Sequence, residues 1–414
     1  MTADMLAALL PELTLLALAV VVLLTGAVRA PSYVGRVPLS APSYVGRVPL
    51  SEASGGPAGP GPTAGPAGWI TLLGLLATFG LTFFVEEGAS LFDGTFVQDS
   101  LALFAKRLFT ASAVLSVLGS LTLRQPAFSR RSAEYHFALV VSVLGMSVLA
   151  SARELILLFV GFELMSIPLF LLTGFLKRDA VAPEAALKFF LVGTASSAVI
   201  VYGMSFIYGA AGSTMLSEIP LALADGPPLL MLGMALLLAG LGFKIAAFPF
   251  HMWAPDTYEA ASTPFVAWLS VAPKAAGFVA IIRIYIEGVG TAALVWAPAV
   301  AVLAGMTMVT GNLMAIPQQN IKRLLAYSGI AHIGYMLVGL AAFSSSGVAM
   351  MLFYLVAYTF GNMGAFLVVQ AVAASEQSEG IEAYRGLAQR SPLLALAMLI
   401  FLLSLGGIPF VAGF

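Results

Sequence analysis

Long apolar runs, separated by short polar segments, recur along the whole chain. Many of these runs reach the ~20 residues that an α-helix needs to cross the hydrocarbon core of a bilayer. No run shows the roughly ten-residue alternation of a transmembrane β-strand. We therefore predict an all-α polytopic membrane protein. Its twelve predicted spans lie near 5–28, 69–86, 101–123, 135–152, 154–175, 184–210, 227–250, 263–286, 291–314, 320–342, 347–374 and 392–414.

Composition supports this fold class. Of the 414 residues, 60% are hydrophobic and 9% are charged, whereas soluble domains carry about 25% charged residues. The first apolar run is longer than the hydrophobic region of a signal peptide and no Lys or Arg precedes it, so we expect a retained helix. The chain has no cysteine, which excludes a thiolate-held iron–sulfur cluster and a cysteine-bound zinc ion. The net charge of −1 gives no indication of a nucleic-acid partner.

The segment between the first two predicted helices contains a repeat. The sequence APSYVGRVPLS occupies 30–40 and returns unchanged at 41–51, and GGPAGPGPTAGPAG follows at 55–68. A composition rich in Pro, Gly and Ala predicts a disordered loop over 29–68.

The distribution of basic residues predicts the orientation. With the N-terminus outside, twelve of the nineteen Lys and Arg residues fall in the inside loops, as expected for cytoplasmic loops. The outside loops and helix ends collect acidic residues and hold four basic residues, which are Lys106, Arg107, Arg153 and Arg283.

The three remaining lysines, Lys188, Lys244 and Lys274, fall within predicted spans. A charge at the centre of a membrane helix costs about 2.5–3.5 kcal/mol on insertion scales. Burial disfavours the charged form of an amino group and a nearby carboxylate favours it, so a movable carboxylate could switch a buried lysine. The predicted partner is Glu163, the acid well inside the span 154–175. Alternatively, Glu163 hydrogen-bonds a neighbouring helix.

Lys244 is the strongest candidate. Pro249, five residues later, removes a backbone hydrogen bond, and broken membrane helices are tolerated where they line hydrated cavities. His251 lies seven residues after Lys244, on the same face if the helix is unbroken. It could relay protons or be a structural histidine.

The other candidates are more ambiguous. Lys274 directly follows Pro273, another backbone disruption beside a charge. Lys188 has Glu184 four residues before it, so a local ion pair is an equal alternative to function. His332 lies mid-helix among small residues, which fits close helix packing as well as a relay.

Several stretches resemble the antiporter-like N subunits of bacterial respiratory complex I, among them GFELMSIPLFLLTGF, FKIAAFPFHMWAPDTYEAASTPF, APKAAGF and QNIKRLLAYSGIAHIGYMLVGLAA. The resemblance implies three N-terminal helices (1–130) followed by two inverted five-helix repeats (135–288 and 290–414). Each repeat would contain a broken helix, 227–250 and 392–414, and GGIPF in the second matches AAFPF in the first. Members of the family continue further, so we expect the second repeat to be incomplete and the chain to be truncated.

The resemblance also implies a function. The chain would be a proton-translocating membrane subunit of NADH:quinone oxidoreductase, an enzyme only as part of that complex and without a redox centre of its own. Glu163 would be the coupling glutamate and Lys244 the pumping lysine, with Lys188, His251 and Lys274 linking them. NADH, FMN, iron–sulfur clusters and quinone would bind to partner subunits and no cofactor to this chain. Neighbouring antiporter-like subunits would surround it in the bacterial plasma membrane.

Other functions fit less well. A subunit of a multisubunit cation/proton antiporter, or of a related hydrogenase-type membrane complex, is the main alternative. A di-haem cytochrome needs paired histidines on facing helices, whereas the three histidines here are scattered. A purely structural scaffold leaves the buried lysines unexplained. One departure from the family pattern is 260-AASTP-264, where Gly-Ala-Pro-Thr-Pro is usual.

Overall fold

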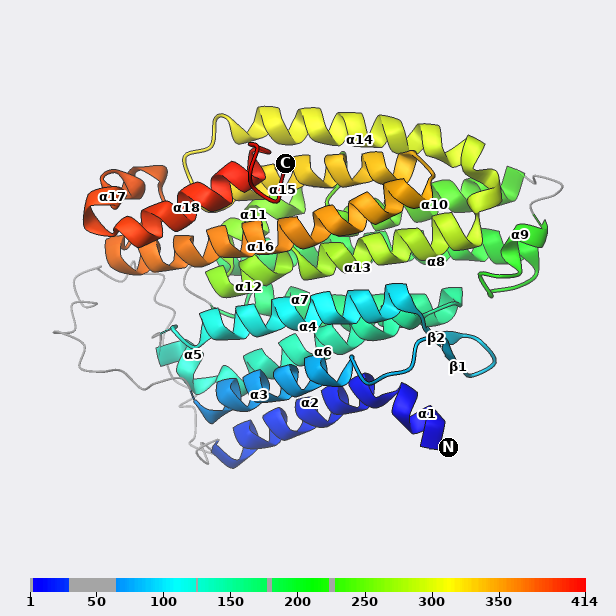
Figure 1. Ribbon diagram of the computed structural model, residues 1–414, viewed down its shortest axis with the longest axis horizontal. Helices are drawn as coiled ribbons and strands as arrows, with labels where there is room; N and C mark the ends of the chain where they lie inside the picture. Colours follow the sequence, from blue (N-terminus) through cyan, green and yellow to red (C-terminus); the bar gives the residue numbers. More distant parts are fainter. Residues whose placement is uncertain (1–2, 30–64, 124–125, 177–180, 223–227) are drawn as a thin grey trace, which may run out of the picture.

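The computed structural model describes residues 3–29, 65–123, 126–176, 181–222 and 228–414, and these residues are almost entirely helical (Figure 1). The repeated APSYVGRVPLS segment and the rest of 30–64 lie outside the described residues. The helices α1–α9 are Ala3–Ala8, Leu10–Arg29, Pro66–Leu81, Ser100–Ser120, Pro126–Arg130, Ser132–Ser151, Leu155–Thr173, Val181–Ala211 and Ile219–Ala222. The helices α10–α18 are Pro228–Ile245, Trp253–Ala260, Thr263–Leu269, Ala272–Ile281, Ala293–Ala315, Ile321–Ala341, Ser345–Glu376, Leu387–Arg390 and Pro392–Leu405.

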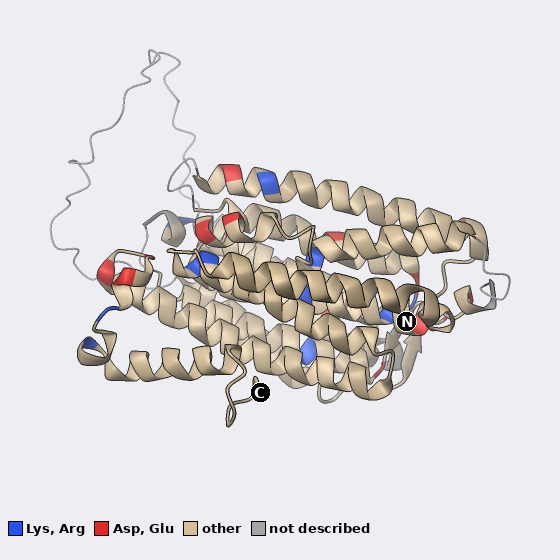
Figure 2. Ribbon diagram, turned by 90° about the horizontal axis from the view of Figure 1, so that it is seen from above, with Lys and Arg blue, Asp and Glu red and all other residues tan. Residues whose placement is uncertain are grey.

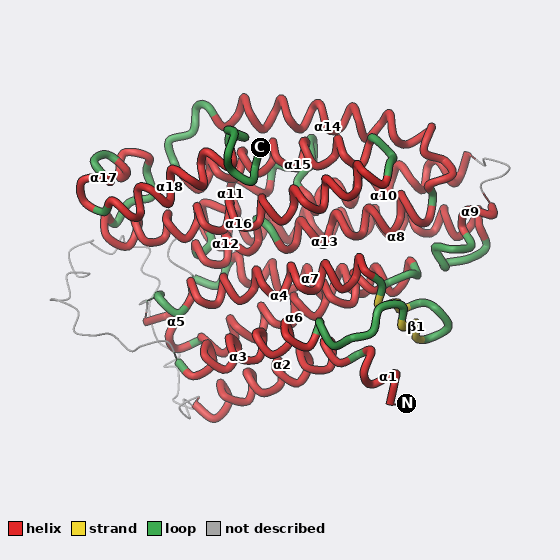
Figure 3. Tube along the Cα trace, in the orientation of Figure 1, coloured by secondary structure: helices red, strands yellow, loops and turns green. Residues whose placement is uncertain are grey.

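Short irregular elements connect some of these helices. A π-helical segment, η3, extends α13, and two 3₁₀ turns are η4 and η5, with bounds Ile282–Gly288, Gly290–Ala292 and Ile381–Tyr384. Strands β1 (Ala89–Leu91) and β2 (Phe96–Gln98) form an antiparallel hairpin in which Ser90 pairs with Val97. Figure 3 shows this hairpin as the strand-containing connection at one end of the bundle.

The predicted fold class is confirmed. Ten helical segments among the described residues are long and apolar enough to cross a membrane. The two other predicted spans coincide with shorter apolar helices, α3 of 16 residues and α18 of 14. Helix α3 begins at Pro66, so the predicted loop ends slightly earlier than 68. Helices satisfy their own backbone hydrogen bonds, which is why apolar runs of this length adopt them in lipid.

A central rod runs through the middle of the bundle and consists of α12, α13 and η3. Every residue from Thr263 to Tyr285 is buried, and Pro264 and Pro273 lie in the first turns of α12 and α13, where their missing N–H groups are not needed. Helices α4, α6, α10 and α16 pack around the rod. An apolar helix without a polar face is expected in such a position.

The bundle has two ends, which differ in their connections. The hairpin end contains β1, β2, α9 and the link between α6 and α7, and the α17 end contains α5, α17 and the link between α14 and α15 (Figure 1). Charged residues gather toward these ends, and a few basic residues lie within the bundle (Figure 2).

The first predicted broken helix is interrupted as expected. Helix α10 stops at Ile245, before Pro249, and the helix resumes only with α11. Ala246 adopts a left-handed conformation with φ of 61°. The N–H of Ala247 donates to the carbonyl of Gly242 at 2.8 Å, a backbone pattern that closes the C-terminus of a helix.

Helix α18 ends with the same pattern. It stops at Leu405, Gly407 has φ of 66°, and the N–H of Ile408 donates to the carbonyl of Leu403 at 3.0 Å. The non-helical residues that follow are visible as the C-terminal loop in Figure 3. Both predicted broken helices therefore end in the same way.

Candidate functional site

Lys244 lies in the last turn of α10, immediately before the break, and is 2% exposed. Its Nζ donates to the hydroxyl of Ser166 on α7 at 2.8 Å and lies 5.1 Å from the ring centroid of Phe162. The C-terminal end of a helix carries a partial negative charge, which favours a cation at this position. The break thus places a buried ammonium group against α7.

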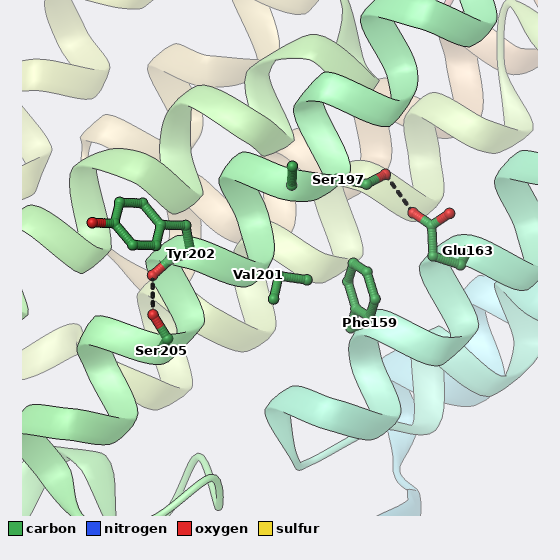
Figure 4. Close-up of a pocket in the computed structure, with 7 residues that line it drawn as sticks. Phe159, Glu163, Ser197, Val201, Tyr202 and Ser205 are labelled. Carbon is green, nitrogen blue, oxygen red and sulfur yellow. Dashed lines mark hydrogen bonds between the residues drawn. The ribbon is translucent and has the colours of Figure 1, made fainter.

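Glu163 lies on α7 one turn before Ser166 and accepts a hydrogen bond from the hydroxyl of Ser197 on α8 at 2.5 Å. It lines an open surface groove of about 610 Å³ between α7 and α8 (Figure 4). The described residues contain no ion pair between Glu163 and Lys244. The structure therefore shows the predicted partners apart, each bound to a serine hydroxyl.

Lys274 lies on the rod less than one turn before Gly277, where the rod packs tightly against α10 beside Lys244. A Cβ at Gly277 would lie 2.7 Å from Ile245 and 3.6 Å from the side-chain Cγ of Lys244, so only glycine permits this approach. Lys274 precedes Gly277 by less than one turn and is 1% exposed. Its Nζ has no hydrogen-bond partner among the described residues and lies 5.5 Å from the ring centroid of Tyr258.

His332 lies on the far side of Lys274. The ammonium group of Lys274 faces α15, where a Cβ at Gly329 would lie 3.2 Å from Nζ. His332 follows Gly329 by three residues on α15, and its Nδ1 shares a 2.6 Å hydrogen bond with the hydroxyl of Tyr354. The ring of Tyr358 lies 5.1 Å from the imidazole. Buried polar groups thus continue from α13 to α15 and α16.

His251 lies in the turn between α10 and α11, and its Nδ1 has no hydrogen-bond partner among the described residues. Its ring stacks on Phe248 with centroids 5.7 Å apart. The predicted alignment with Lys244 required an unbroken helix, and α10 ends before His251, so that spacing argument is wrong. Burial lowers the pKa of His251, because it disfavours the charged form of the imidazole.

Comparison with known proteins decides the family. A sequence profile described as "NADH:quinone oxidoreductase/Mrp antiporter, TM" matches residues 152–414. The chain belongs to this antiporter-like family. NADH-quinone oxidoreductase subunit N of Desulforamulus reducens is 45% identical over 351 residues, which cover 84% of this chain and 73% of the relative. The protein of the same name from Heliobacterium modesticaldum is 44% identical over 348 residues, again 84% and 73%.

Solved structures of the antiporter-like family share the fold. A chain of respiratory complex I from Thermus thermophilus, solved with bound aureothin, is 32% identical with a TM-score of 0.73, covering 97% of this chain and 80% of that one. A chain of the archaeal membrane-bound sulfane sulfur reductase gives a TM-score of 0.78 at 22% identity, covering 98% and 78%. At that identity the likeness shows the fold alone.

Within this antiporter-like fold, Lys188 is not a buried charge. Its side chain is 52% exposed and pairs with Glu184 at 2.8 Å and with Asp256 of α11 at 3.3 Å. The expected burial of Lys188 is therefore wrong, because it lies on an outward face of α8, and the predicted local pair with Glu184 is present. Burial raises the pKa of Asp256, but the hydrogen bonds and charges of Arg323 and Lys188 outweigh it and hold that pKa below its usual value.

Sequence reasoning missed the serine hydroxyl that binds Lys244 and the tyrosines that lie near Lys274. Ser166 follows Glu163 by three residues and so shares its helix face, a spacing that could have indicated a role. Tyr258 and Tyr358 come from α11 and α16, and nothing local in the sequence relates either residue to Lys274.

The buried basic residues also differ from expectation. Lys106 and Arg283 were assigned to loops or helix ends, yet both are fully buried. They have carboxylate partners, Glu12 for Lys106 and Asp99 for Arg283. Lys244 and Lys274 have none among the described residues.

Proposed function

We propose that the chain is a proton-translocating membrane subunit of an NADH-quinone oxidoreductase. The observation that carries the proposal is the pair of buried ammonium groups, Lys244 and Lys274, which have no ion-pair partner among the described residues. Ionisable groups within a membrane bundle are expensive and commonly mark ion or proton pathways. The names of the relatives from Desulforamulus and Heliobacterium support the same assignment.

Glu163 and Lys244 would act as a separable pair. A buried ammonium keeps its proton best when a carboxylate lies nearby, and Glu163 is separated from Lys244 by the single turn of α7 that carries Ser166. A movement of α7 or a change in the charge of Glu163 would therefore alter how firmly Lys244 holds its proton. The hydroxyls of Ser166 and Ser197, which bind Lys244 and Glu163, would stabilise the state in which the two charges are apart.

Released protons would pass from Lys244 toward Lys274 and on to His332. Gly277, three residues after Lys274, packs against Lys244, and Gly329, three residues before His332, lies beside the ammonium group of Lys274. Lys188, paired with Asp256 near the α17 end of α8, would serve proton uptake, and His251 would serve as a neutral relay in the turn after α10. We assign these two residues on their positions and on the family resemblance.

The surroundings follow from the same proposal. The α17 end would face the cytoplasm of a bacterial plasma membrane and the N-terminus the outside, because the described basic residues near that end include Arg130, Arg131, Arg385 and Arg390. Other membrane subunits, among them antiporter-like ones, would flank this chain. Electrons would pass through NADH, FMN, iron–sulfur clusters and quinone held by other subunits.

We also propose that 135–288 and 290–414 are two inverted repeats that follow the N-terminal helices within 1–130. The shared ending of α10 and α18 supports this division. In the second repeat Ser404 and Leu405 occupy the last turn, where the first has Lys244.

The direct test is proton translocation by the assembled complex in sealed vesicles, measured per electron transferred from NADH to quinone. Lys244→Ala and Lys274→Ala should each lower the number of protons per electron by the share that this subunit contributes. Arg131→Ala is the matched control, because it removes an exposed charge paired with Glu134 and should leave the ratio unchanged. Wild-type ratios in both lysine variants would refute the proposal.

Cation/proton antiport is a second candidate, since the matching family profile also covers Mrp antiporters. Sodium flux in the same vesicles separates the two functions. Sodium-dependent proton movement without NADH would favour the antiporter.

A further inference from the structure

A cluster of six charged residues at the hairpin end is not used by the proposed proton path. It contains three acidic and three basic residues, so its formal charges balance; they are Glu12, Asp99, Glu287, Lys106, Arg153 and Arg283. Helix α2, the start of α4, the link between α6 and α7, and η3 each contribute at least one member. Lys106 pairs with Glu12, and the other four residues form a linked set around Arg283, so segments far apart in the sequence meet at this end.

Arg283 is the centre of this cluster and is fully buried. Its two terminal nitrogens donate to the two carboxylate oxygens of Asp99 at 2.6 and 2.7 Å, a bidentate contact. It also donates to Glu287 at 2.8 Å and to the carbonyl of Ala150, at the end of α6, at 2.8 Å. Arg283 thus fixes the end of the central rod to α4 and α6 together.

Arg283 and Asp99 hold permanent charges and are unsuited to carrying protons. Burial alone would raise the pKa of Asp99, but the hydrogen bonds and charges of Arg283 and Arg153 outweigh it and hold that pKa well below its usual range. Asp99 therefore stays ionised at physiological pH, and arginine does not lose its proton in proteins. A positional role fits these groups better than proton transfer.

Helix α4 holds the rod at a second point. Ser116, sixteen residues into α4, donates to the carbonyl of Pro264 at 2.9 Å. Asp99 and Ser116 lie seventeen residues apart along α4, and Pro264 and Arg283 lie nineteen residues apart along the rod. Lys274 lies between these two contacts on the rod.

We propose that Arg283 is a positioning residue for Lys274, because its contact with Asp99 fixes the rod along α4 and so fixes where Lys274 lies between Tyr258 and Gly329. This inference rests on the proposed function. Arg283 follows Lys274 by nine residues, about 13 Å along the helix axis. It reaches Lys274 only through the rod and touches none of the proposed proton carriers. Arg283 lies in the π-helical segment η3. Such segments are rare in proteins, but those that occur are often found at functional sites.

The test measures the number of protons translocated per electron by the assembled complex. The loss in each variant is compared with the loss in Lys274→Ala. Arg283→Gln should show at least half of that loss while NADH oxidation by an artificial electron acceptor is retained. Arg283→Lys, which keeps the charge, should restore part of the ratio. A merely structural residue would lower the amount of assembled complex and leave the ratio of each complex unchanged.

Arg153→Gln is the matched control. Arg153 contacts the same two carboxylates, Asp99 at 2.6 Å and Glu287 at 3.2 Å, but belongs to the α6–α7 link and not to the rod. It should leave the ratio unchanged. If Arg283→Gln does not assemble, Asp99→Asn, which leaves Arg283 paired with Glu287, should show the same loss.

The outcomes separate the two proposals. A wild-type ratio in the Arg283 or Asp99 variant, beside an impaired Lys274→Ala, would overturn the positioning role alone. An equal loss in Arg153→Gln would also overturn the positioning role. The loss would then follow from removing any positive charge near Asp99 and Glu287, and not from releasing the rod. A wild-type ratio in Lys274→Ala would refute the proton path itself, and the positioning role with it.

Discussion

Two regions of the bundle bury basic side chains in opposite ways. At the hairpin end, Lys106 has Glu12 at 2.5 Å and the side-chain oxygen of Gln98 at 2.6 Å. In the middle of the bundle, Lys244 has only a serine hydroxyl, and Lys274 has no hydrogen-bond partner among the described residues. The three lysines are almost equally buried. The two regions therefore differ in whether a carboxylate pairs with the buried ammonium group.

The comparison teaches how to separate architecture from function within one membrane protein. A buried ion pair is a fixed feature, and breaking it leaves an uncompensated charge. A buried charge without a counter-ion changes its protonation more readily than one that is paired. Lys106 and Arg283 belong to the first kind, and Lys244 and Lys274 to the second.

The largest expected effect tests this distinction through stability. Lys106→Met leaves the carboxylate of Glu12 buried alone and should lower the free energy of unfolding by about 3–5 kcal/mol. Lys244→Met keeps the length of the side chain and leaves no unpaired carboxylate in contact, so it should change stability by less than about 1 kcal/mol. Thermal unfolding of the purified protein in detergent measures both.

A double variant sharpens this first prediction. Glu12→Gln combined with Lys106→Met removes both charges, and should recover at least half of the stability lost in Lys106→Met. Equal destabilisation by Lys106→Met and Lys244→Met would remove the basis of the comparison.

The sequence indicates one of these regions and not the other, for a physical reason. Lys244 stands out because an apolar run, a lysine and Pro249 occur within a few residues, and the break is a local property of the backbone. Lys106 and Arg283 lie near the ends of their apolar runs, where basic residues ordinarily reach the membrane surface. Asp99, the partner of Arg283, is 184 residues away, and only the packed topology brings them together. Lys188 falls within a predicted span but lies on an outward face of α8. Which face of a helix points outward depends on that packing and cannot be told from the local sequence.

The second prediction concerns pH and the ionised state of the hairpin-end cluster. The pKa of Asp99 is lowered on folding, so its contribution to stability is fully present above the unfolded value of about 3.9 and is lost as pH falls from there through the lowered folded-state value. Asp99→Asn should therefore cost about 2–3 kcal/mol near pH 7, and the difference between the two proteins should begin to shrink below about pH 4. Unfolding midpoints across this range measure it, and a constant difference at all pH values would contradict the lowered pKa.

The third prediction contrasts two glycines of α15. A Cβ at Gly334 would lie 2.8 Å from the backbone N of Met308, whereas one at Gly329 would meet only side-chain ends, the Tyr358 hydroxyl at 2.7 Å and Lys274 Nζ at 3.2 Å. Gly334→Ala should cost about 1–2 kcal/mol through overpacking and leave proton translocation unchanged. Gly329→Ala should cost less and lower the number of protons per electron, because it displaces the ammonium group.

Reversed results for the two glycine variants would show that the position of Lys274 is unimportant. The hairpin end and the middle of the bundle would then differ in stability alone, and the unpaired lysines in the middle would have no role in proton translocation.

The smallest expected effect separates a hydroxyl that binds Lys244 from one that only binds the backbone. Ser166 accepts from Lys244 and donates to the carbonyl of Phe162 at 2.6 Å, and Ser142 donates to the carbonyl of Met165 at 2.8 Å. Each Ser→Ala change removes one buried hydroxyl and should cost about 1 kcal/mol. Only Ser166→Ala should shift the pH profile of proton translocation, since it removes the group that holds Lys244 apart from Glu163. The same profile in both variants would mean that the hydroxyl takes no part in the separated state, and that burial alone sets the behaviour of Lys244.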